Sequence, residues 1–459
     1  MSFDYGDSLA NDILILDGGD IYRYSGKSFY GRGGEITIMG GSIGVGFVLS
    51  SYSKLYGYNK DGEWMWNMEL VLSESDNTSI KCSIESLETS FDSGYLLACK
   101  ADGGDGQRYL AEITKDGKLK RFRKGYSWEW ANPIIKKTED NKYLIVYRNH
   151  IGGKVLALKM NRDMEIKRGV VYNMRGDYIS LVAATATYDG GYAIILGLPW
   201  EEPEFVDGRY MVMKCGADGR IQWSGRIINY GDEMIEPVGM IEDRDDKSLV
   251  IGGKGGYVLK LDTDNGIPVF NKSIKYELYR EKEGFDVPVN LSSIIKDIRG
   301  GYILSGGNES GDKYVIKVDS EGNVVWYWSE YNDEYYDYDK DDNPNPCYWE
   351  SDTFGGYETI QIEEDMFITR FYERHSSWSC NTDPHSYMVT YVLKFRDKGY
   401  YCKNRPENDI SISVDKVNFG IKYGEISIDT SNFEEQLSDV EVKVNREDGK
   451  IISIICVGF

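Results

Sequence analysis

The chain of 459 residues contains 75 Asp and Glu against 53 Lys and Arg, which gives a formal net charge of −22. Attraction to phosphate backbones or to an anionic membrane surface needs the opposite sign, so neither nucleic acid nor a membrane is an expected partner. No stretch approaches the roughly 18 apolar residues of a membrane span, and the N-terminus lacks the basic start and apolar run of a signal peptide. These features predict no membrane insertion and leave a cytoplasmic location and a surface- or virion-associated one both open.

Residues 1–34 are expected to hold a strand pair. The apolar runs at residues 13–16 and 21–24 flank an Asp-Gly-Gly-Asp turn, which is the sequence form of a hairpin. Such a pair either completes the last unit of the repeat that follows, and so closes a ring, or caps that repeat.

Between residues 35 and 402 one four-strand unit recurs. Its clearest copy spans residues 294–328, where runs rich in Val, Ile and Tyr alternate with turns of Gly, Asn and Asp, as in an antiparallel meander. The second strand of the unit is marked by a turn, an aromatic residue or Leu, and an apolar run, and the marks are about 48 to 65 residues apart. They stand at Phe47, Tyr95, Tyr143, Tyr192, Leu249, Tyr302 and Phe367.

A second signal, a short acidic turn that mostly contains Gly, keeps step with the first. It occurs at residues 61–62, 116–117, 163, 218–219, 264–266, 321–322 and, as Lys-Gly, 398–399. Asp-Gly between alternating strands is a strong hairpin signal because Gly tolerates positive φ. The two signals together predict an all-β, seven-bladed β-propeller of four-stranded antiparallel blades, with eight blades as the alternative.

The last repeat carries two insertions, residues 331–356 and 373–384, and is followed by a linker at residues 403–408. Residues 409–459 alternate apolar and polar side chains and lack the aromatic second strand. We therefore expect residues 403–459 to form a small C-terminal β module, with an extra blade as the alternative.

Three units resemble repeats of the quinoprotein-like (PQQ-like) β-propeller superfamily: residues 55–66, 211–223 and 314–326. In that superfamily an apolar strand is followed by Asp, a short Gly turn and a Trp that begins the outer strand. The resemblance covers about residues 35–403. It implies the fold and a scaffold or binding role. The outer-strand residues Trp66, Trp223 and Trp326 are expected to pack between blades, the alternative being that they line a cofactor site. Enzymes of the superfamily also carry adjacent Cys residues at the cofactor site, and this chain has none, so catalysis is not implied.

The seven cysteines form no CxxC pair. Cys82, Cys99, Cys215 and Cys456 lie within or beside apolar strand runs, where a free Cys behaves as a small hydrophobe. Three more lie in or near the insertions and leave room for one disulfide among them. Reduced thiols are the expected state.

The first insertion holds the densest candidate site. Asp337, Asp339 and Asp341 alternate along it, and carboxylates so placed could converge on Ca²⁺, which takes oxygen ligands. The comparison with an EF-hand fails after the third ligand because Asp342 replaces the turn Gly. A solvated acidic loop is the alternative, and no other metal or cofactor is expected.

Aromatic residues are interleaved with these acids and supply rigid contact area with polar handles. We expect them to bind a protein or glycan partner, the alternative being a self-packed loop. The candidate residues are Tyr335, Tyr336, Tyr338, Tyr348 and Trp349.

Catalytic patterns are weak. His375, Cys380 and His385 match no common zinc spacing, and a chain with three His and no GxSxG elbow gives no support to acyl transfer. The favoured function is a non-catalytic binding or scaffold protein that presents its loops to a protein or glycan, a role that a surface or virion component would fit. The alternative is a glycan hydrolase or lyase, or a quinoprotein-like oxidoreductase, with acids at the central channel.

Overall fold

A computed structural model provides the structure of the protein. It describes residues 12–16, 36–42, 46–51, 54–59, 64–73, 79–101, 107–125, 130–149, 152–174, 179–198, 209–229, 236–280, 283–307, 313–330, 348–364, 366–379, 382–396, 410–416, 419–423, 428–432, 438–439, 443–445 and 454–456. Every regular element among these residues is a β-strand, and no helix in this part of the chain is long and apolar enough to cross a membrane.

Five sheets each hold one antiparallel blade. In four of these blades the strands follow one another along the chain. The first two comprise β10 (Trp130–Lys137), β11 (Tyr143–Asn149), β12 (Lys154–Met160) and β13 (Ile166–Met174), then β14 (Ser180–Ala186), β15 (Tyr192–Gly197), β16 (Tyr210–Cys215) and β17 (Ile221–Asn229). The third comprises β18 (Glu236–Asp243), β19 (Ser248–Lys254), β20 (Tyr257–Asp262) and β21 (Pro268–Arg280), extended by β22 (Glu283–Pro288). The fourth comprises β23 (Leu291–Lys296), β24 (Tyr302–Gly307), β25 (Lys313–Val318) and β26 (Val324–Glu330).

The fifth blade contains both early and late parts of the chain. Three of its strands are consecutive: β27 (Tyr348–Glu363), β28 (Met366–Ser379) and β29 (Thr382–Arg396). The fourth is β1 (Asp12–Leu16), which pairs with β29 from Ile13↔Leu393 to Leu16↔Thr390. The N-terminal segment thus places a strand on this blade, while residues 21–24 of the expected pair lie outside the described residues.

The sixth sheet is longer and contains the first two repeats. Its chain-ordered strands are β2 (Ile36–Ser42), β3 (Gly46–Ser51), β4 (Lys54–Asn59), β5 (Trp64–Ser73), β6 (Ser79–Thr89), β7 (Tyr95–Ala101), β8 (Arg108–Ile113) and β9 (Leu119–Lys124). The separate blades therefore number five rather than the expected seven. The two repeats are joined because β5 and β6 are longer than a blade, with 10 and 11 residues, and pair from Val71↔Lys81 to Ser73↔Ser79.

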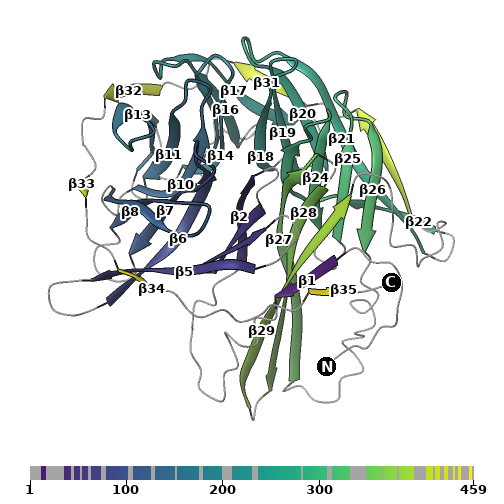
Figure 1. Ribbon diagram of the computed structural model, residues 1–459. Coiled ribbons are helices and arrows are strands. Elements are labelled where there is room, and N and C mark those ends of the chain that lie inside the picture. The colour runs from purple at the N-terminus through teal and green to yellow at the C-terminus, as the bar shows by residue number, and fades with distance from the viewer. Residues whose placement is uncertain are drawn as a thin grey trace.

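The sheets close into a ring (Figure 1). The innermost strands lie against one another in the order β2, β6, β10, β14, β18, β23 and β27, and β27 lies against β2. Each sheet is therefore packed between two neighbours, the arrangement of a β-propeller.

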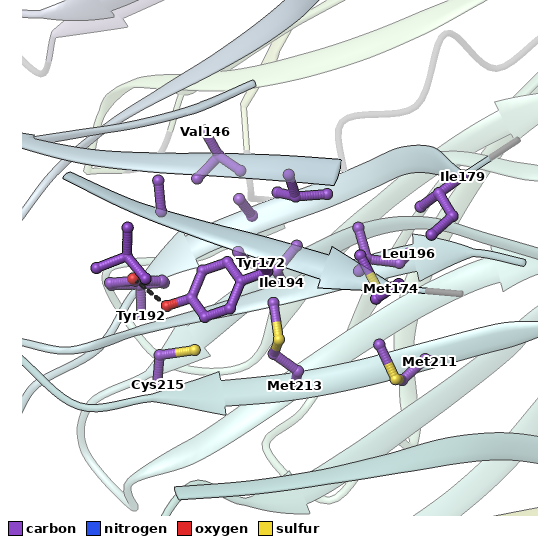
Figure 2. Packing of buried hydrophobic residues seen from close by; sticks show 14 of the residues in the cluster. Val146, Tyr172, Met174, Ile179, Tyr192, Ile194, Leu196, Met211, Met213 and Cys215 are labelled. Carbon is purple, nitrogen blue, oxygen red and sulfur yellow. Dashed lines mark hydrogen bonds between the residues drawn. The ribbon is translucent and has the colours of Figure 1, made fainter. Parts of the chain in front are cut away.

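Apolar residues on both faces of the second and third strands make this stacking favourable. All residues of β15, β24 and β25 are buried. Between the blades β10–β13 and β14–β17, Tyr172 and Tyr192 share a hydrogen bond inside an apolar cluster that includes Met213 and Cys215 (Figure 2). Burial raises the pKa of Cys215 to about 12, so this thiol stays protonated.

Outer-strand Trp residues dock on the turn of the next blade, as the sequence predicted for Trp66 and Trp223. The indole Nε1 of Trp66 donates to the carbonyl of Lys115 at 2.7 Å, and that of Trp223 donates to Thr263 at 2.9 Å. Gly117 is required beneath Trp66, because its φ is +70° and a Cβ there would stand 2.5 Å from the indole.

The C-terminal tail, defined as β30–β35, corrects the expectation of a separate module or an extra blade. Each of its strands pairs antiparallel with a different strand of the ring. Successive strands of the tail pair with partners that lie progressively earlier in the chain. The pairs are β30 (Ile410–Lys416) with β21, β31 (Phe419–Tyr423) with β17, β32 (Ile428–Asn432) with β13, β33 (Ser438–Asp439) with β9, β34 (Lys443–Asn445) with β5 and β35 (Ile454–Cys456) with β1. The tail forms this way because outer strands present unpaired backbone groups that another strand can satisfy.

Two of the described cysteines differ from the expected reduced state, and a third agrees with it. Cys82 of β6 and Cys99 of β7 form a disulfide across adjacent strands, and Cys215 is free and buried. Both bonded residues are fully buried, which fits the apolar setting that the sequence showed but not the prediction of free thiols.

A Gly117→Ala variant tests the Trp docking. Gly255 has a similar φ of +79° but no atom within 4 Å of an added Cβ, so Gly255→Ala carries only the backbone cost. We expect Gly117→Ala to lower the free energy of unfolding by about 1–3 kcal/mol more than Gly255→Ala does, measured in urea. Equal costs for the two variants would show that Trp66 does not hold this joint.

The disulfide is tested by peptide mapping without reductant and by unfolding of a Cys82→Ala/Cys99→Ala variant. Cross-linking residues 17 apart in sequence constrains the unfolded chain, so its loss should cost about 2–4 kcal/mol. Cys215→Ala is the control for loss of a buried sulfur without a cross-link. Recovery of both peptides as free thiols from unreduced protein would contradict the assignment.

Candidate binding surface

The strands β27, β28 and β29 are the three long strands of their blade, whereas in the blade β18–β22 only β21, with 13 residues, approaches their length. They have 16, 14 and 15 residues, whereas each strand of the neighbouring blade β23–β26 has six or seven. Pairing with β1 ends at Thr390. The residues beyond that pair, 348–354, 373–379 and 382–389, therefore form an extension, here called the projecting sheet, which leaves the ring in Figure 1. At roughly 3.3 Å per residue it reaches about 25 Å.

The base of this extension is fixed to the blade β23–β26 by hydrogen bonds. The buried hydroxyl of Thr359 is 2.7 Å from that of Ser305 and 2.8 Å from that of Thr369. Gln361 donates its amide to Asp297 at 3.1 Å and accepts from the backbone N–H of Ile298 at 3.0 Å. The projecting sheet therefore stands on a well-packed support, a usual arrangement for recognition elements.

Buried ion pairs hold the carboxylates of this support. Asp297 is fully buried and pairs with Lys317, and Asp243 of the next blade receives hydrogen bonds from Lys296 and from the Tyr302 hydroxyl at 2.6 Å. Burial alone would raise the pKa of Asp243, but these hydrogen bonds hold it below its ordinary value, so the carboxylate is charged at neutral pH.

Equivalent pairs recur in other blades. The third-strand Lys214 is fully buried and donates to Asp189 at 2.8 Å, in the turn that precedes the second strand. Lys159, Lys260 and Lys317 occupy the same place in their own blades. This series was not predicted from the sequence, although a Lys inside the apolar third strands β12, β16, β20 and β25 was a visible signal. Its role is structural, because each ammonium group neutralises a carboxylate in the turn before the second strand of its own blade.

Backbone register sorts the projecting sheet into two faces. Directly opposite residues share a face, and successive residues of a strand alternate. One face contains Trp349 opposite Trp378, followed by a row of hydroxyl residues, and is here called the aromatic-hydroxyl face. Its positions are Trp349, Ser351 and Thr353 of β27, Arg374, Ser376 and Trp378 of β28, and Ser386 and Met388 of β29.

The predicted binding residues are only partly placed. Trp349 and Tyr348 both begin β27 but, being consecutive, fall on opposite faces of the projecting sheet. Tyr335, Tyr336, Tyr338 and the three acids Asp337, Asp339 and Asp341 lie outside the described residues. The structure adds Trp378, which the sequence analysis missed because only the register reveals that it lies opposite Trp349.

Among the residues whose side chains are described, no group of three or more His, Cys, Asp or Glu is arranged to hold a metal ion. The side chains of the projecting sheet are not in that set.

Comparisons with known proteins assign no family to the chain. No protein-family model matches the chain, and no curated protein matches it. Among solved structures it is similar to a protein of unknown function from Bacteroides caccae, at 11% identity over 70% of this chain and 94% of that chain, with a TM-score of 0.34. A likeness this small carries no argument. The fold itself defines the class: an all-β propeller of four-stranded antiparallel blades, which is consistent with a binding or scaffold role.

Proposed function

We propose that the protein is a non-catalytic binding scaffold that presents the aromatic-hydroxyl face of its projecting sheet to a glycan. The observation that carries this proposal is the register that sets Trp349 opposite Trp378 on a sheet standing clear of the ring. Trp rings offer apolar faces for stacking on sugar rings, and Ser and Thr offer donors and acceptors for sugar hydroxyls.

The aromatic residues Tyr335, Tyr336 and Tyr338 belong to the insertion that precedes β27 in the chain, and we propose that they extend the same contact surface. We propose that Asp337, Asp339 and Asp341 bind a calcium ion, and addition and removal of Ca²⁺ test this assignment. A surface or virion component is the setting in which such a scaffold would serve.

We further propose that the ring counts seven blades of the quinoprotein-like type, with the ten-stranded sheet contributing two. Seven inner strands follow one another around the ring, and β2 and β6 lie in it as separate members. The docking of Trp66 and Trp223 on the next turn supports the relation to that superfamily. An enzyme with acids at the central channel is the competing hypothesis, and no contact among the described residues favours it.

Binding is tested on a glycan array with the wild-type chain and with Trp349→Ala and Trp378→Ala variants. Each truncation removes one stacking surface, so we expect affinity to fall about tenfold or more, equivalent to at least about 1.4 kcal/mol. Tyr348→Ala, on the opposite face, is the matched control and should bind as the wild type does.

The result that would overturn the proposal is the absence of any glycan signal, or equal binding by the wild type and both Trp variants. Capture of a protein ligand that depends on Trp349 and Trp378 would instead show the same face serving a protein partner. Melting temperatures of all variants, expected within a few degrees of the wild type, exclude loss of fold as the cause.

A further inference from the structure

Two of the three His residues in the chain lie on the projecting sheet. His375 of β28 is directly opposite Tyr387 of β29, and Ser377 is opposite His385. His375 and His385 are therefore diagonal neighbours on adjacent strands and occupy the same sheet face. Diagonal neighbours are about 7–8 Å apart, a separation that two metal-ligating imidazoles can span.

The third strand places two carboxylate residues in the same two rows. On β27, Asp352 is directly opposite His375, and Glu350 is opposite Ser377. One row thus reads Glu350, Ser377, His385 and the next reads Asp352, His375, Tyr387 across three strands. All of these positions are on the face opposite to Trp349, which we call the histidine-carboxylate face.

We propose that the histidine-carboxylate face binds a divalent transition-metal ion, Zn²⁺ in the first instance, at His375, His385, Glu350 and Asp352. Imidazole and carboxylate together suit Zn²⁺, whereas Ca²⁺ and Mg²⁺ prefer sites made of oxygen alone. The spacing along the sequence matches no zinc motif because the positions are assembled by strand pairing.

This site is independent of the proposed glycan contact, which uses the other face. A metal ion here would tie β27, β28 and β29 together at a distance from the ring, beyond the last pair with β1 at Thr390. Metal binding would stabilise the native sheet because the unpaired strands do not present the four positions together.

The test titrates the chelator-treated full chain with Zn²⁺ by calorimetry and with Co²⁺ by visible absorption. We expect one ion per chain, a tetrahedral cobalt spectrum, and little competition from excess Ca²⁺ or Mg²⁺. His375→Ala and His385→Ala should each weaken binding by at least a hundredfold, and Glu350→Gln or Asp352→Asn by about tenfold. Affinity should fall as the pH drops below about 6.5, where imidazole is protonated.

His150→Ala is the matched control, because His150 is the remaining His and belongs to an earlier repeat. Its titration should equal that of the wild type. The proposal is overturned if no stoichiometric binding occurs, if both His375→Ala and His385→Ala bind as the wild type does, or if a thiolate-to-cobalt band places Cys in the site. Circular dichroism of each variant checks that the fold is retained. The glycan array, repeated with His375→Ala, separates failure of this site from failure of the proposed contact.

Discussion

The structure depends on one constraint: a blade with two apolar faces can bury both only when it stands between two others. Strands such as β15 and β24, buried along their whole length, would expose about half of their apolar surface in a lone sheet. The ring satisfies this requirement for every blade at once. The polar contacts between blades, such as those from the indole of Trp223 to Thr263 and from the amide of Gln361 to the carboxylate of Asp297, then set how neighbouring blades align.

Features that arise from local sequence were predicted well. Gly favours hairpin turns because it tolerates positive φ, and the Gly positions at 117, 219, 266 and 322 all have it. The aromatic residues that mark the second strands, such as Tyr143 and Tyr302, are buried as their setting in apolar runs suggested. Docking by outer-strand Trp followed from the same repeat, since a Trp at a fixed distance from each turn must meet an equivalent surface of the next blade.

Features that depend on pairing between distant residues were not predicted. The alternation at residues 410–414 fits any sheet edge, so sequence alone could not show that this strand pairs with β21 rather than with its neighbours in the tail. Cys82 and Cys99 lie on adjacent strands, but their disulfide becomes evident only from the register of β6 and β7. For the same reason the two faces of the projecting sheet, and the place of Trp378 on one of them, were not predicted. The register of β27 and β28 decides which of their residues lie opposite each other.

The position of β1 between β29 and β35 has a consequence for the order in which the protein is made. The strand β1 precedes every blade in the chain but must wait for residues near position 390, and the tail strands pair around the ring only after the blades that receive them exist. The repeats can pair locally as they emerge from the ribosome, yet the ring stays open until β29 has been made. Because these closing contacts join the most distant parts of the chain, they should form slowly and last.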